Sequence, residues 1–144
     1  MNPSENIGLL RRAKADFSIA ELILGGELSD PVQLDIAAYH LQQTVEKLLK
    51  HRMVENGIAF KFVHEIDVLC DQMEDNGISP PEWVRKSESV LTDYGTKTRH
   101  HNTIIASKTK LNSLMPLAKE FLEQQIQESL KLQAVQDKDD APEH

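Results

Sequence analysis

Arg99, His100 and His101 stand next to one another and carry side chains that could bind a phosphate and transfer a proton. The planar guanidinium of arginine binds phosphate oxygens in pairs, and the pKa of histidine lies near neutral pH. Metal-free RNA cleavage needs a base for the 2′-hydroxyl, an acid for the leaving oxygen and a cation for the phosphorane charge. The three residues are therefore candidate catalytic groups.

A structural role for the same three residues is the alternative. Arg99 would then pair with an acid such as Asp93, and the histidines would lie at a helix terminus, where free carbonyls favour polar or cationic groups. His100 and His101 are neighbours, and neighbouring side chains on a helix point about 100° apart. Because no other residues stand at metal-ligand spacing, we expect no metal and no cofactor.

A second candidate site, for a nucleotide or a partner, consists of Glu46, Lys47, Lys50 and Tyr94. The charged residues could surround a nucleotide phosphate, although an alternating charged face is usually only solvated. Tyr94 could stack on a base, but its position on an apolar stripe also suits core packing or a dimer interface.

Apolar residues recur every three or four positions in five segments, which indicates amphipathic helices. The segments are residues 5–24, 31–56, 64–75, 79–98 and 104–132. Asp30-Pro31 and the Ser79-to-Glu82 capping box predict helix starts, and His64 is expected to cap the short helix. Short connections favour an all-α, five-helix, up-and-down antiparallel bundle with four long helices and one short one.

The sequence makes specific predictions for two of these segments. In the second segment, Leu34, Ala37, Ala38, Leu41, Val45, Leu48 and Leu49 should face the core, and the outer face should include Gln42, Glu46, Lys47 and Lys50. In the last segment, Pro116 should either kink the helix or mark a new start, because proline lacks an N–H and clashes with the preceding turn.

The composition fits one globular domain over residues 1–132, followed by an acidic tail at residues 133–144 that we expect to be disordered. No apolar run approaches the length of a membrane span, and no signal peptide is apparent, so a cytoplasmic protein is expected. The net charge of -7 opposes nonspecific attraction to nucleic acid but leaves room for a local basic cleft.

The sequence AAYHLQQTVEKLLK at residues 37–50 resembles the second-helix signature of HEPN (higher eukaryotes and prokaryotes nucleotide-binding) domains. Three further features occur in the expected order: Ala15-Asp16 with Ala20-Glu21-Leu22, then His64-Glu65-Ile66, and then Tyr94 ahead of Arg99-His100. Together the resemblance covers about residues 5–125.

This resemblance implies a five-helix bundle that is usually homodimeric and is often encoded beside a minimal nucleotidyltransferase. Many members of the family are ribonuclease toxins, and others bind nucleotides or partners without catalysis. In the nucleases, four to six residues separate an arginine from a following histidine. No histidine lies at that distance after Arg99.

We therefore expect a HEPN-type nucleotide- or partner-binding module, paired with a nucleotidyltransferase in a toxin–antitoxin-like system. One alternative is a metal-independent ribonuclease that binds RNA and uses an atypical Arg-His-His site at the dimer cleft. The other is a purely structural helical adaptor.

Overall fold

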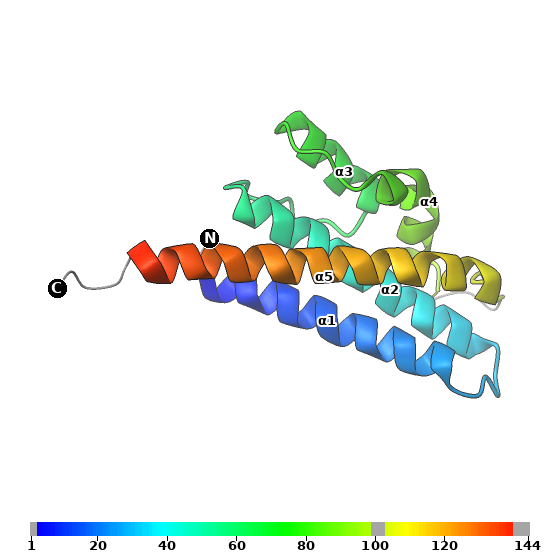
Figure 1. Cartoon of the computed structure of the whole chain (residues 1–144). Coiled ribbons are helices and arrows are strands. Elements are labelled where there is room, and N and C mark those ends of the chain that lie inside the picture. The colour runs from blue at the N-terminus through cyan, green and yellow to red at the C-terminus, as the bar shows by residue number, and fades with distance from the viewer. Residues whose placement is uncertain (1–2, 99–102, 140–144) are drawn as a thin grey trace.

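The computed structural model describes residues 3–98 and 103–139 of the chain. Within these ranges the chain forms five α-helices and no strand, with bounds α1 Pro3–Gly25, α2 Val32–Glu55, α3 Ile66–Asp75, α4 Glu82–Thr96 and α5 Lys108–Asp139. Figure 1 shows α1 running antiparallel to α2 and to α5, with the shorter α3 and α4 on the other side of α2. The predicted all-α, five-helix fold is confirmed.

Helix α2 lies at the centre of the bundle and contacts each of the other four helices. Its predicted inner face is confirmed, since all but one of its seven residues have no exposed surface, and Leu34 is half-buried. Burial of this apolar stripe, with the facing stripes of the other helices, supplies the main driving force for folding.

The prediction that four polar residues form the outer face of α2 is largely wrong. Gln42, Glu46 and Lys50 are all buried, and Lys47 is half-buried. Because neighbouring helices surround α2, little of its circumference is left for solvent. Buried polar groups are costly unless they find partners, and the partners of these side chains are described below.

Local signals define both ends of α2. The side chain of Asp30 accepts a hydrogen bond of 3.0 Å from the backbone N–H of Val32, as the Asp30-Pro31 start predicts. At the other end, Gly57 has a φ of 74°, and the N–H of Ile58 donates to the carbonyl of Met53 at 2.9 Å. This left-handed glycine cap ends the helix without a Cβ penalty.

Two expectations about the starts of the short helices are corrected. The Ser79 capping box does not form, because α4 begins after Pro81 with no side-chain cap hydrogen bond. Glu65, not His64, precedes the first residue of α3. In the loop before α3, Phe60 is half-buried and packs against the core, whereas Phe62 is 93% exposed.

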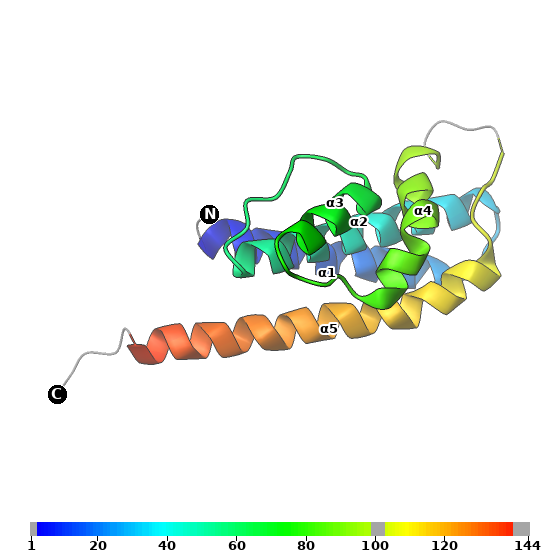
Figure 2. The ribbon, with the colours of Figure 1, turned by 90° about the horizontal axis from the view of Figure 1, so that it is seen from above.

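Helix α5 is continuous through Pro116, so the alternative of a fresh start there is wrong. The turned view in Figure 2 shows a bend in the first third of α5, as a proline in a helix predicts. The helix begins at Lys108, later than the expected residue 104, and continues through Asp139, past the domain boundary predicted at residue 132. In the described residues, no helix combines the length and hydropathy needed to cross a bilayer.

Candidate functional site

Arg99, His100 and His101 lie outside the described residues, but the structure defines both flanks of the segment that contains them. On the α4 side, the hydroxyl of Thr98 donates to the carbonyl of Tyr94 at 2.5 Å. Lys97 forms an ion pair of 3.3 Å with Asp93, the acid proposed as an alternative partner for Arg99.

On the other flank, Asp35 connects the first turn of α2 to the residues that precede α5. One of its carboxylate oxygens accepts hydrogen bonds from the backbone N–H groups of Ile105 at 3.1 Å and Ala106 at 2.9 Å. Asp35 is only 6% exposed. Charge-assisted hydrogen bonds in such a buried position are strong, so Asp35 fixes the return of the chain beside α2.

Tyr94 is 2% exposed and lies in the core. Burial raises the pKa of its hydroxyl, and the negative charge of Asp35 raises it further. A side chain buried to this extent packs against the bundle and offers no ring face for a ligand base.

Glu46 and Lys50 form a buried ion pair of 3.2 Å, with side chains 5% and 9% exposed. The other carboxylate oxygen of Glu46 lies 3.0 Å from Nδ1 of His64 and accepts from Nε2 of Gln42 at 3.2 Å. The ammonium of Lys50 also lies 5.2 Å from the ring centroid of Phe60, within cation–π range. The chain itself thus supplies partners to both charges.

Lys47 points away from this pair, toward α1. Its ammonium donates to Asp16 at 2.6 Å and to Gln43 at 3.0 Å, and Asp16 also contacts Nδ1 of His40 at 2.9 Å. The structure therefore brings Glu46 and Lys50 together but separates them from Lys47. The four predicted binding residues, including the buried Tyr94, do not converge on one cavity.

A second buried polar cluster, between α2 and α5, was not predicted from the sequence. Nδ1 of His51 lies 3.1 Å from Oε1 of Gln125 and 3.1 Å from Oε1 of Glu55. Both His51 and Gln125 have no exposed surface. The sequence feature that could have predicted this cluster is spacing, because residues 41, 44, 48, 51 and 55 recur at steps of three and four along the buried side of α2.

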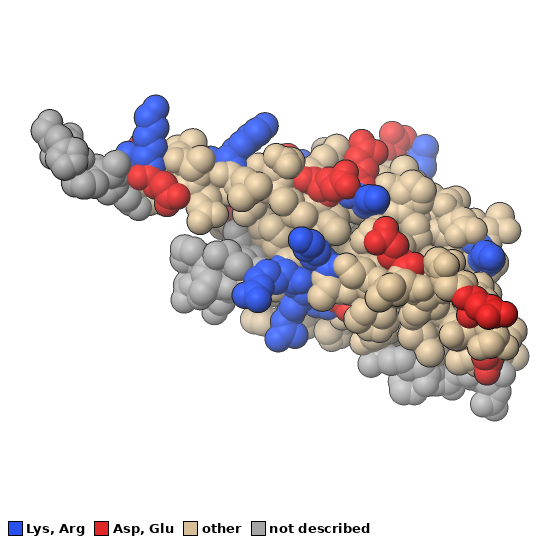
Figure 3. Space-filling model, turned by 60° about the horizontal axis from the view of Figure 1, so that its bottom comes forward, with Lys and Arg blue, Asp and Glu red and all other residues tan. Residues whose placement is uncertain are grey.

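Charged side chains on the described surface carry both signs, and Figure 3 shows acidic and basic groups on the same face of the molecule. Arg11, Arg12 and Lys14 are exposed on α1 and were not predicted from the sequence as part of a site. In the described part of the chain, no group of three or more His, Cys, Asp or Glu side chains is placed to hold a metal ion.

Comparison with known proteins gives one match. A family model described as "HEPN domain" matches residues 8–129. Searches of the curated proteins and of the solved structures found no match. The matched range spans all but the ends of the helical bundle and includes the segment between α4 and α5.

Proposed function

Because the chain belongs to the HEPN domain family, which supports a general role connected with nucleotides or RNA, we propose that it is a nucleotide-binding module. The binding groups that we propose are Arg99, His100 and His101, in the segment between α4 and α5. The observation that carries the proposal is the Asp35 carboxylate, which holds the backbone at Ile105 and Ala106. It keeps the end of this segment against α2.

The chemistry of this segment suits an anion. Arg99 and the two histidines place up to three cationic groups at consecutive positions of a chain whose net charge is -7, and Lys97, paired with Asp93 at 3.3 Å, lies two residues earlier. Arginine binds phosphate through a planar fork, and histidine adds a positive charge when protonated. A local cluster of this kind attracts phosphate even when the protein as a whole is acidic.

Glu46, Lys47, Lys50 and Tyr94 take a supporting role in this proposal. The lysines are already paired with Glu46 and Asp16, so a phosphate would have to displace these acids. We propose that Lys47 ties α2 to α1 through Asp16, that Glu46 and Lys50 hold the loop before α3 against α2, and that Tyr94 packs α4 into the core. A ligand contact at any of them would require the side chains to rearrange.

Binding without cleavage is favoured by the sequence after Arg99, where the histidine of the nuclease motif is absent. The competing function is a metal-independent ribonuclease in which His100 or His101 moves the proton at a dimer cleft.

We further propose, from the family resemblance, a homodimer and a nucleotidyltransferase partner in a toxin–antitoxin-like system. A structural adaptor is the remaining alternative, and it predicts no affinity for nucleotides.

A thermal-shift titration with ATP, GTP and short RNAs tests the proposal, since a ligand that binds only the native state raises Tm. We expect stabilisation of the wild type and its loss in Arg99→Ala. Arg12→Ala, which removes an exposed arginine from α1, is the matched control and should retain binding. No stabilisation by any nucleotide would support the adaptor, and equal losses in both variants would indicate nonspecific attraction to charge.

Incubation of the wild type and of Arg99→Ala with RNA separates binding from cleavage. We expect no cleavage by either protein. Cleavage by the wild type that disappears in Arg99→Ala would replace the binding proposal with the ribonuclease, whereas equal cleavage by both would point to a contaminating nuclease.

A further inference from the structure

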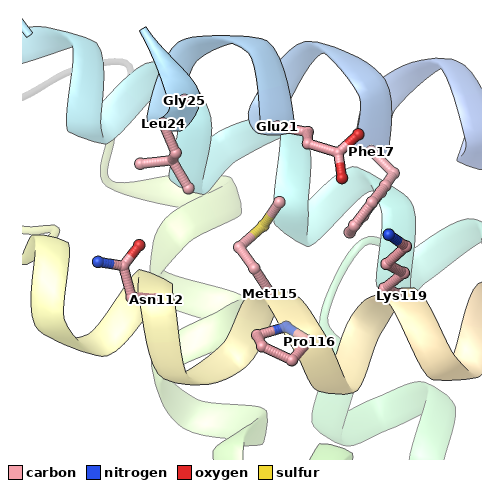
Figure 4. Close-up of a pocket in the computed structure, with 8 residues that line it drawn as sticks. All are labelled: Phe17, Glu21, Leu24, Gly25, Asn112, Met115, Pro116 and Lys119. Atoms are coloured by element: carbon pink, nitrogen blue, oxygen red, sulfur yellow. The ribbon is translucent and has the colours of Figure 1, made fainter. Parts of the chain in front are cut away.

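A pocket of about 430 Å³ opens between α1 and α5, at the position of Pro116 (Figure 4). Phe17 and Leu24 line it from α1, and Met115 lines it from α5. Phe17 is 5% exposed, while Leu24 and Met115 are half-buried, so the floor is apolar and partly open. Pockets of roughly 300–1,000 Å³ with apolar walls and a few polar groups are typical of small-molecule sites.

The rim of this pocket carries one acid and one base on opposite helices. Figure 4 shows Glu21 extending from α1 and Lys119 extending from α5 into the space between the two helices. Both residues are exposed, and neither forms an ion pair with another residue in the described ranges. Each charge is therefore able to meet a ligand group of opposite sign.

Pro116 interrupts the hydrogen bonding of α5 in the wall of the pocket. Pro116 has no N–H, so the carbonyl of Asn112, four residues earlier, lacks its usual helical donor. Asn112 and Pro116 both line the pocket.

We propose that this pocket binds a free α-amino acid with a large apolar side chain. The side chain would lie on Phe17, Leu24 and Met115, with the ammonium group toward Glu21 and the carboxylate toward Lys119. An apolar amine would leave Lys119 beside a cation, and an apolar acid would leave Glu21 beside an anion. Only a zwitterion complements both rim charges, and the inference is independent of the nucleotide-binding proposal.

Three probes of matched shape test the charge requirement: phenylalanine, phenethylamine, which lacks the carboxylate, and 3-phenylpropionate, which lacks the ammonium. Binding to the full chain is followed by NMR chemical shifts of the Met115 methyl group and the Phe17 ring. We expect phenylalanine to bind roughly fivefold more tightly than either probe, as befits single charge contacts at an exposed rim. Leucine and methionine should bind at the same place.

Two neutral variants should reverse these preferences. Glu21→Gln should make 3-phenylpropionate the best ligand, and Lys119→Gln should make phenethylamine the best. Both side chains are exposed, so folding should be unaffected. Glu27→Gln and Lys110→Gln, which remove an exposed acid and an exposed base that do not line the pocket, should leave all three affinities unchanged.

Three results would overturn the proposal. The first is the absence of saturable shifts with any amino acid at millimolar concentration. The second is equal binding of the three probes, or affinities that neither rim variant changes. The third is a dependence of the Met115 and Phe17 signals on protein concentration without ligand, which would show that a second copy of the chain occupies the pocket.

Discussion

Asp35 and Ala106 are joined by a hydrogen bond of 2.9 Å from the Ala106 backbone amide to the Asp35 carboxylate. The bond links the first turn of α2 to the residues before α5 and lies in the interior, where water competes weakly. It follows the segment that contains Arg99, so the backbone path into α5 depends on a side chain about 70 residues earlier in the sequence.

Asp35→Asn should weaken this connection, because the neutral amide retains an acceptor oxygen but loses the charge. We expect a loss of about 1–2 kcal/mol in the free energy of unfolding, together with faster hydrogen exchange at the Ile105 and Ala106 amides. Asp75→Asn, which changes an exposed acid at the end of α3, is the control. Unchanged exchange at both amides would contradict the role of Asp35.

The Glu46–Lys50 pair should be strongly coupled, because each charge is buried and removal of one leaves the other without its main partner. We expect Glu46→Gln or Lys50→Met to cost about 3 kcal/mol each, and the double variant to cost clearly less than their sum. Urea unfolding of the four proteins measures the coupling. The exposed Glu82–Lys86 pair, at 3.0 Å, is the control and should couple by about 0.5 kcal/mol or less.

Additive costs at Glu46 and Lys50 would show that the two charges do not depend on each other. A stable Lys50→Met protein that has lost nucleotide binding would instead favour the direct ligand role first suggested by the sequence.

The buried face of α2 was predictable from the sequence because helical periodicity is a local property, and Leu41, Val45 and Leu48 recur at the required spacing. The burial of Glu46 and Lys50 was not, because it depends on how many helices surround α2. A charged residue between apolar stripes has the same local pattern whether it meets solvent or a buried partner.

The candidate site could not be predicted in full for the same reason, since its contacts depend on the tertiary arrangement. Asp35 contacts Ala106, and His51 contacts Gln125, across more than 70 residues of sequence, and no spacing rule links such pairs. Arg99, His100 and His101 stand out by residue type alone, and their predicted roles stay predictions.

Gly95→Ala should destabilise the protein although alanine is the better helix former. A Cβ at Gly95 would lie 2.7 Å from Cδ of Gln42, and Gln42 is held by hydrogen bonds to Glu46 and to the His64 carbonyl. Displacing that side chain should outweigh a propensity gain of up to about 1 kcal/mol and give a net loss of about 1–2 kcal/mol.

Gly8→Ala is the matched control for this substitution, because a Cβ at Gly8 meets nothing within 4 Å in the interior of α1. It should stabilise the protein by up to about 1 kcal/mol. Stabilisation by both substitutions would mean that Gln42 has room to move away from α4.

The stability of the protein should depend on pH through Glu55. Burial raises the pKa of Glu55 from 4.5 to about 7, and the negative charge of Glu128 contributes to the shift. A carboxyl whose pKa is raised on folding stabilises the native state fully below pH 4.5, and this contribution is lost as the pH rises through 7. Glu55→Gln keeps the shape of the protonated form, so its advantage over the wild type should grow from pH 4.5 to 7 and then level off.

His51 should make the stability change with pH in the direction opposite to Glu55, because burial lowers its pKa from 6.5 and the folded state favours the neutral ring. Its contribution is present above pH 6.5 and is lost as the pH falls through the lowered pKa. In Glu55→Gln, the free energy of unfolding should therefore still fall toward acid pH because of His51, but should no longer fall as the pH rises through 7. Urea unfolding between pH 4.5 and 8 measures both changes. Glu82→Gln, at an exposed position, should follow the wild-type profile. If Glu55→Gln followed it too, Glu55 would have to titrate in the folded chain as it does in the unfolded one, despite its place beside His51 and Glu128.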